Sequence, residues 1–215
     1  MPESTSPEYI LFFPGYTCSL ITRDSPKNLL QKRPRYFRHK KIMSGGSEDN
    51  HVKTVYAHFG LALYLASVLE HGLANTLMCA ELLPSRAGSP VPRMQWEAEF
   101  DAFMDQQFEK TLGRLIRSLN NATSVPMELE GLLTEALEKR NFLAHHYFRE
   151  RAEAFISHEG REAMIEELEH AQKLFENADD WLTEIAKPLR EKYGLSDERL
   201  KPIQEEYLKK FKHDL

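Results

Sequence analysis

The sequence predicts an all-α protein, a bundle of four to five helices in an up-and-down arrangement. Proline is absent from residues 51–83 and again from residues 127–187, although the chain has 11 prolines. Proline-free stretches of this length with helical periodicity are typical of long helices. The chain also lacks convincing alternation of period two and any Asn-Gly or Asp-Gly turn, so no sheet is expected.

Composition and charge fit a globular protein of ordinary domain size. Of the 215 residues, 41% are apolar and 28% are charged, which is the balance of a folded soluble chain. Residues 1–50 hold eight Lys/Arg and five Asp/Glu, whereas residues 51–215 hold 20 and 28. The acidic body argues against a surface that coats nucleic acid broadly, but it allows a small basic cleft.

Expectations for location and cofactors follow from features that the sequence lacks. Its two cysteines, Cys18 and Cys79, are too few for a disulfide framework or a four-ligand zinc site. The longest mainly apolar run, residues 61–69, is far shorter than a membrane span, and the N-terminus carries Glu3 and Glu8 where a signal peptide needs positive charge. We therefore expect a cytoplasmic protein with reduced thiols, no cofactor, no metal and no membrane partner.

Three helices are predicted in the first part of the body. The first covers about residues 51–83 and would be about 50 Å long. After a proline-rich loop, the second covers about residues 94–119, where apolar residues largely recur at three-and-four spacing. The third begins near Met127, just after Pro126, and its apolar stripe continues to Leu137.

The fourth predicted helix is the most regular, because its apolar residues alternate steps of four and three. This seam is suited to packing against another helix, in the same chain or in a second copy. Its members are Met164, Leu168, Ala171, Phe175, Ala178, Leu182 and Ile185. Pro188 is expected to end this helix, and Ser196 is expected to cap a short amphipathic helix that follows.

The chain thus divides into three parts. Residues 51–187 form the predicted bundle, and residues 188–215 form the amphipathic C-terminal helix. Residues 1–50 form a basic arm, in which positions 23–41 carry eight Lys/Arg and one Asp. The sequence leaves three interpretations of the arm open: it binds RNA or DNA, it is a solvated disordered tail, or it is an extension upstream of a natural start at Met43.

The end of the third helix brings an arginine onto an apolar stripe. The periodicity predicts core positions at 140, 144 and 147, yet position 140 is an arginine. Its guanidinium must find partners or line a cleft, because an unpaired buried charge is very costly. Glu70, on the first predicted helix, is a candidate partner for Arg140.

Three further polar groups lie near Arg140 in sequence. Tyr147 falls about 20° from Arg140 around an ideal helix, and Asn141 and His145 share the neighbouring face. Together these side chains suit the cleavage of an RNA phosphodiester by its own 2′-hydroxyl. That reaction needs an acid or base that titrates near neutral pH, which histidine supplies, and a cation beside the phosphorane oxygens, which arginine supplies.

The geometry of one straight helix does not bring the two central groups together. Arg140 and His145 would lie about 140° apart around the helix axis. They converge if the helix bends or ends near His145, or if two copies meet across a two-fold axis and combine their residues.

The pattern Arg140-Asn141-x-x-x-His145-x-Tyr147 resembles the signature of HEPN domains (higher eukaryote and prokaryote nucleotide-binding domains). The resemblance implies a bundle of four or five helices over residues 51–187 and a metal-independent endoribonuclease that acts as a homodimer, with the motif at the interface. It assigns catalysis to Arg140 and His145, with Asn141 in support. The tyrosine resembles HEPN toxins paired with a minimal nucleotidyltransferase antitoxin, which implies that Tyr147 is a site residue that such a partner adenylylates.

Several alternatives stay open at this stage. His146 also satisfies the spacing of the family, although we favour His145. Arg140 forms an ordinary ion pair and Tyr147 an ordinary core contact if the chain is a non-catalytic HEPN-like module for binding or regulation. Glu167-x-x-His170 has the spacing of a di-iron ligand pair, but no second Glu-x-x-His lies on another predicted bundle helix.

Overall fold

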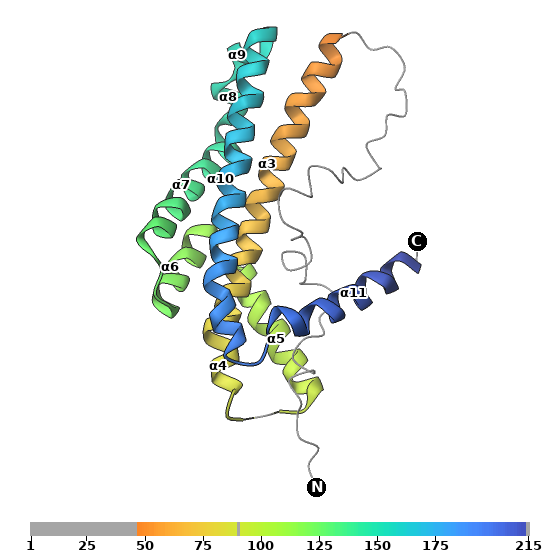
Figure 1. Ribbon diagram of the computed structural model, residues 1–215. Helices are drawn as coiled ribbons and strands as arrows, with labels where there is room; N and C mark the ends of the chain where they lie inside the picture. Colours follow the sequence, from red (N-terminus) through yellow and green to blue (C-terminus); the bar gives the residue numbers. More distant parts are fainter. Residues whose placement is uncertain (1–46, 90, 214–215) are drawn as a thin grey trace.

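The computed structural model describes residues 47–89 and 91–213, and it contains helices and connecting turns but no strand within those ranges (Figure 1). The all-α prediction is therefore confirmed. Of the predicted basic arm, residues 1–46 lie outside the described ranges. The elements are α3 (Ser47–Leu77), η3 (Met78–Leu82), α4 (Leu83–Arg86), α5 (Arg93–Phe108), α6 (Leu112–Ala122), α7 (Met127–His145), α8 (Tyr147–Glu150), α9 (Ala152–Ile156), α10 (His158–Glu191) and α11 (Asp197–His213).

Two long helices, α3 and α10, run side by side in the same direction and form the axis of the bundle (Figure 1). Small buried residues, such as Ala62 on α3 and Ala171 on α10, allow the backbones to approach closely. The approach is tightest at Gly72, where an added Cβ atom would lie 2.2 Å from Oδ1 of Asp179 on α10. Any larger residue at position 72 would push α10 or the buried Asp179 carboxylate away.

The main apolar core lies between α3, α6, α7 and α10. Its members include the heptad seam predicted on α10, from Met164 to Leu182, and that seam therefore packs within the same chain. A second cluster forms around η3, α4 and α5. It contains Ala74, Cys79, Leu82, Leu83, Trp96, Phe100, Met104 and Leu195.

Two predicted helix boundaries were wrong. The first helix does not end at Leu83, because a π-helical turn, η3, leads directly into α4, where Pro84 is tolerated in the first turn. The predicted helix over 94–119 is broken between α5 and α6. At this break Thr111 is extended, and Lys110 Nζ donates to Gln107 Oε1 at 2.7 Å and to Ser118 Oγ at 3.2 Å. The break lets both helices pack on α3, although the apolar pattern runs through it.

Pro188 does not end α10, which continues to Glu191. In the last turn of α10, Arg190 donates from Nη1 to the carbonyl oxygen of Leu195 at 3.0 Å and forms an ion pair with Asp197. This buried guanidinium fixes the turn into α11, the helix predicted after Ser196. The carbonyl oxygen of Ser196 accepts the backbone N–H groups of Arg199 and Leu200, as expected at a helix start.

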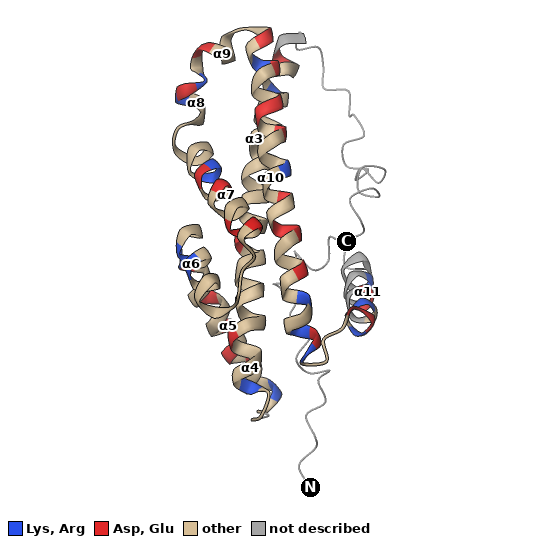
Figure 2. Ribbon diagram, turned by 60° about the vertical axis from the view of Figure 1, so that its left-hand side comes forward, with Lys and Arg blue, Asp and Glu red and all other residues tan. Residues whose placement is uncertain are grey.

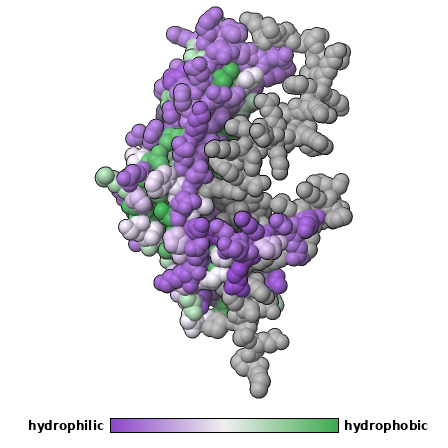
Figure 3. Space-filling view, viewed as in Figure 1, coloured by the Kyte–Doolittle hydropathy of each residue, from purple (hydrophilic) through white to green (hydrophobic). Residues whose placement is uncertain are grey.

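The helical stretch Asp49–Arg86 is longer and more apolar than the run of residues 61–69 suggested. One 18-residue window within it has a mean hydropathy of 1.4, so by length and composition this helix would suffice to cross a membrane. Core helices of soluble proteins, which are mostly buried, meet the same criterion, whereas 22% of this window is buried. In the fold this helix packs along α10, whose outer surface forms a hydrophilic stripe (Figure 3).

The junction of α9 and α10 requires glycine at position 160, and this gives the first prediction. The Gly160 N–H donates to Ser157 Oγ at 3.0 Å, and an added Cβ atom would lie 2.1 Å from the carbonyl oxygen of Ala154. We expect Gly160→Ala to lower the free energy of unfolding by about 2 kcal/mol, because backbone atoms must move. Urea titration followed by circular dichroism measures this loss.

The matched control for that prediction is Gly60→Ala on α3. Nothing lies within 4 Å of a Cβ atom added there, so alanine should leave stability unchanged or raise it by up to about 1 kcal/mol through helix propensity. Equal effects of the two substitutions would contradict the close contact at the α9–α10 junction.

Candidate functional site

The predicted motif lies where α7 ends and the chain turns back toward α10. α7 ends at His145, and His146 leaves the helical conformation with φ −128° and ψ −25° before α8 begins at Tyr147. The short helices α8 and α9 then lead to α10 (Figure 2). α7 ends near His145 as expected, but Arg140 and His145 both lie within it, so this helix end does not by itself bring their side chains together.

Arg140 is held at the edge of the contact between α7 and α3. Its Nη2 atom lies 3.1 Å from Oε1 of Glu70 on α3, and its Nη1 atom donates to Asn141 Oδ1 at 3.3 Å. This confirms Glu70 as the partner of Arg140. The Arg140 side chain is 31% exposed and that of Glu70 is 26% exposed, so the pair is neither sealed in the core nor free in solvent.

The predicted core positions were correct in part. Tyr147 is buried and Arg140 is half-buried, as the stripe predicted. Position 144 was wrong, because Ala144 is exposed and Leu143 is buried in its place. The inward face of α7 drifts by one residue here, since 3.6 residues per turn do not repeat evenly over two turns.

Asn141 and His145 are exposed, as expected for residues on one outward face. Within the described residues His145 makes no hydrogen bond, and its ring meets that of His146 edge-on at 6.3 Å. His146 is engaged differently, because its Nδ1 atom lies 2.8 Å from Nη2 of Arg149. Arginine can only donate, so Nδ1 accepts. The freer imidazole of His145 is therefore the better candidate for acid–base chemistry.

Tyr147 does not share this surface. Its side chain is 1% exposed, and its hydroxyl donates to the carbonyl oxygen of Met164 on α10 at 3.0 Å. Burial raises the pKa of Tyr147 far above its usual range, and the nearby carboxylate of Glu167 adds to the effect. In this conformation Tyr147 is a core residue that ties α8 to α10, and its hydroxyl is closed to a modifying partner.

Glu167 on α10 forms ion pairs with two basic side chains near the motif, Lys139 and Arg151. It accepts two hydrogen bonds from Arg151, at 2.8 and 3.0 Å, and lies 3.7 Å from Lys139 Nζ. Both cations also lie over the ring of Phe142, at 5.2 and 5.6 Å from its centroid. This cluster joins α7, the turn between α8 and α9, and α10, and Arg151 occupies both carboxylate oxygens of Glu167.

A second polar cluster, which sequence reasoning missed, joins the first turns of α3 and α10. Donor atoms of His51, His158 and Glu162 lie within 4.8 Å of one another, a spacing that could hold a metal ion. Arg161 Nε, however, donates to His51 Nδ1 at 3.2 Å. A neutral ring then carries its proton on Nε2, which lies 2.6 Å from Glu162 Oε1 but without good hydrogen-bond geometry.

This arrangement fits a helix-joining network better than a metal site, because a metal would need the Nε2 lone pair. Arg161 also donates to the carbonyl oxygens of Phe155 and Ile156, so its buried charge fastens the end of α9. The spacing of His158 and Glu162 was visible in the sequence. The contribution of His51, more than 100 residues away, was not.

Cys79 is buried in the second cluster. Burial raises the pKa of the Cys79 thiol to about 12, so the thiolate that a nucleophile requires is scarce near neutral pH.

Comparisons of the chain with protein-family models, with curated proteins and with solved structures found no match. The interpretation of this site therefore rests on its residues and their geometry.

The buried hydroxyl of Tyr147 gives a prediction that depends on pH. Near pH 8, Tyr147→Phe should lower the free energy of unfolding by about 1 kcal/mol, through loss of the hydrogen bond to Met164. Above a pH of about 10 the unfolded tyrosine ionises while the folded one stays neutral, so the wild type loses stability that the variant keeps. The difference between the two proteins should disappear by about pH 11 in urea titrations.

The other tyrosines are common to both proteins, so their titration cancels in this difference. A difference that stays constant from pH 8 to pH 11 would contradict the buried position of the Tyr147 hydroxyl.

Proposed function

We propose that the protein is a metal-independent endoribonuclease of HEPN type that acts as a homodimer in the cytoplasm, in toxin–antitoxin defence or RNA processing. The observation that supports this most directly is that a half-exposed, anchored Arg140 and an exposed His145 lie on the same helix, α7. Asn141 follows Arg140 directly in sequence and accepts a hydrogen bond from it.

In the proposed reaction His145 takes the proton from the attacking 2′-hydroxyl or gives one to the departing 5′-oxygen. The 2′-oxygen forms a bond to phosphorus as the 5′-oxygen leaves, so the products end in a 2′,3′-cyclic phosphate and a 5′-hydroxyl. Arg140 stabilises the extra negative charge of the phosphorane. A guanidinium has five N–H donors, and those not used by Glu70 and Asn141 are available to the phosphate.

A dimer completes the proposed site. Arg140 and His145 lie about 140° apart around an ideal helix, so two copies would supply complementary halves across a two-fold axis. Regulation by a nucleotidyltransferase antitoxin through Tyr147 would further require α8 to detach from α10, because the hydroxyl is buried.

A non-catalytic HEPN-like module is the second candidate. The ion pair between Arg140 and Glu70 and the burial of Tyr147 favour it, since both are ordinary structural roles. RNA cleavage that depends on His145 distinguishes the candidates, because the non-catalytic module predicts no cleavage.

The test is cleavage of single-stranded RNA in EDTA by the purified protein and its variants. We expect Arg140→Ala and His145→Ala each to lower the cleavage rate by roughly 10²- to 10⁴-fold, because each removes one part of the acid–base and charge stabilisation. Arg140→Lys should recover only part of the loss, since lysine lacks the forked donor geometry.

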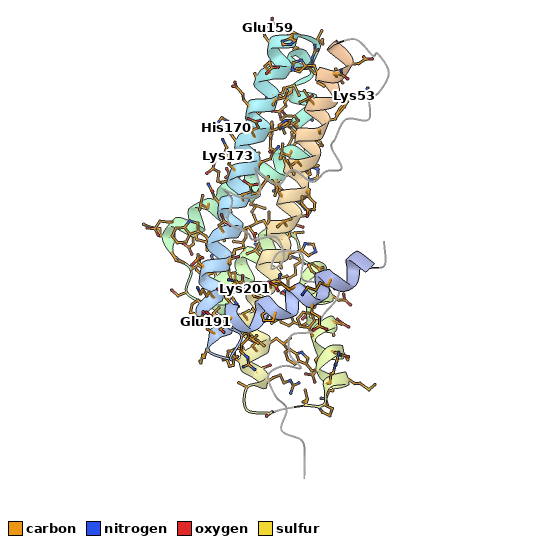
Figure 4. All side chains as sticks on the ribbon, turned by 45° about the vertical axis from the view of Figure 1, so that its right-hand side comes forward. Lys53, Glu159, His170, Lys173, Glu191 and Lys201 are labelled. Atoms are coloured by element: carbon orange, nitrogen blue, oxygen red, sulfur yellow. The ribbon has the colours of Figure 1, made fainter. Side chains whose placement is uncertain are left out.

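His170→Ala is the matched control, because His170 is an exposed histidine that points outward from α10 (Figure 4). It should cleave at the parent rate. Cleavage that survives both Arg140→Ala and His145→Ala in folded protein would refute the proposed site.

A further inference from the structure

Three aromatic side chains meet beside the motif, and we call them the aromatic ledge. They are Tyr56 on α3, Phe148 on α8 and Phe155 on α9. The ring of Tyr56 lies 5.5 Å from that of Phe148 and 5.7 Å from that of Phe155, and the two phenylalanines lie 6.0 Å apart. The phenylalanines are half-buried, whereas Tyr56 is 52% exposed.

The phenylalanines of the ledge pack against the core of the bundle. Phe148 packs against Phe59 at 4.8 Å and against the buried Tyr147 at 5.4 Å between ring centroids. Because Tyr147 is itself tied to α10, the rings behind Tyr56 belong to the core and cannot move freely. An aromatic side chain that is half-exposed and rigidly backed presents a prepared flat surface to solvent.

The ledge lies close to the His145 end of the motif. Phe148 follows His145 by three residues and lies on α8. Next to it stands Arg149, whose side chain is 73% exposed. Arg149 contacts His146 Nδ1 at 2.8 Å, and its carboxylate neighbour Glu150 lies 3.7 Å away. An exposed aromatic face and an exposed guanidinium therefore flank the same end of the motif.

We propose that Tyr56, backed by the ledge, stacks on an unpaired base of an RNA bound across the His145 end of the motif, so that the substrate is single-stranded RNA. This rests on the proposed function. Stacking on aromatic rings beside cations is the physical basis of single-strand recognition, whereas bases in a duplex are paired and stacked on each other. Arg149 supplies the charge for the adjoining phosphate, on a body that is otherwise acidic.

The test measures binding apart from cleavage. The His145→Ala protein in EDTA is titrated with a single-stranded RNA of about 12 nucleotides, and with the same RNA paired to its complement. Tyr56→Ala in this background should raise the Kd for the single strand about tenfold, which is the effect of losing one stacked base. Tyr56→Phe should bind like the parent, because it keeps the ring.

Tyr64→Ala is the matched control, since Tyr64 lies on the same helix and is also 52% exposed but is not part of the ledge. It should change the Kd by less than about twofold. Tyr56→Leu separates the loss of base stacking from misfolding, because leucine keeps apolar contact with the phenylalanines yet stacks poorly. Thermal melting confirms that each variant is folded.

The outcomes separate the two proposals. The ledge proposal is overturned if the His145→Ala protein fails to bind the single strand, or if adding Tyr56→Ala and adding Tyr64→Ala change its Kd equally. Either result counts even where the unmodified protein cleaves RNA. The ledge proposal is also overturned if Tyr56→Ala raises the Kd for the single strand and for the paired RNA equally. A selective loss of single-strand binding in Tyr56→Ala supports the ledge, even if the parent protein cleaves no RNA and the nuclease proposal fails.

Discussion

The parallel pairing of α3 with α10 is the constraint on which the rest of the fold depends. Small residues and Gly72 allow the two helices to lie close together, and both run in the same direction. α7 must therefore run opposite to both, and the chain must reverse between the end of α7 and the start of α10. That reversal is made by α8 and α9, and it leaves His145 at the exposed end of the helix that also carries the half-buried Arg140.

The reversal is secured by polar contacts as well as by apolar ones. Glu167 holds Arg151, Tyr147 donates to Met164, and Arg161 fastens the end of α9. Each of these contacts leaves a buried or half-buried polar group satisfied, which is the condition for placing such groups near a core. The surface above them keeps Asn141, His145 and Arg149 exposed. Support from packed residues beneath exposed polar groups is what a binding or catalytic site requires.

The features that sequence reasoning predicted are local ones. The proline-free stretches, the heptad of α10 and the start of α7 at Met127 were visible because each depends on neighbouring residues. The break between α5 and α6 was hidden, since the apolar spacing continues across it. The burial of Tyr147 followed from the stripe, but its bond to Met164 did not. The network of His51 and Arg161 joins residues 110 positions apart, and one sequence offers no signal for such a pairing.

The central claim is that the chain cleaves RNA through the 2′-hydroxyl, with Arg140 and His145 as the reacting side chains. The most direct measurement is mass spectrometry of the RNA fragments formed by the purified parent protein in EDTA. The account predicts fragments that end in 2′,3′-cyclic phosphate, with 5′-hydroxyl groups on their partners. Fragments with 3′-hydroxyl and 5′-phosphate ends would contradict it, because those ends require attack by water and not by the neighbouring 2′-oxygen.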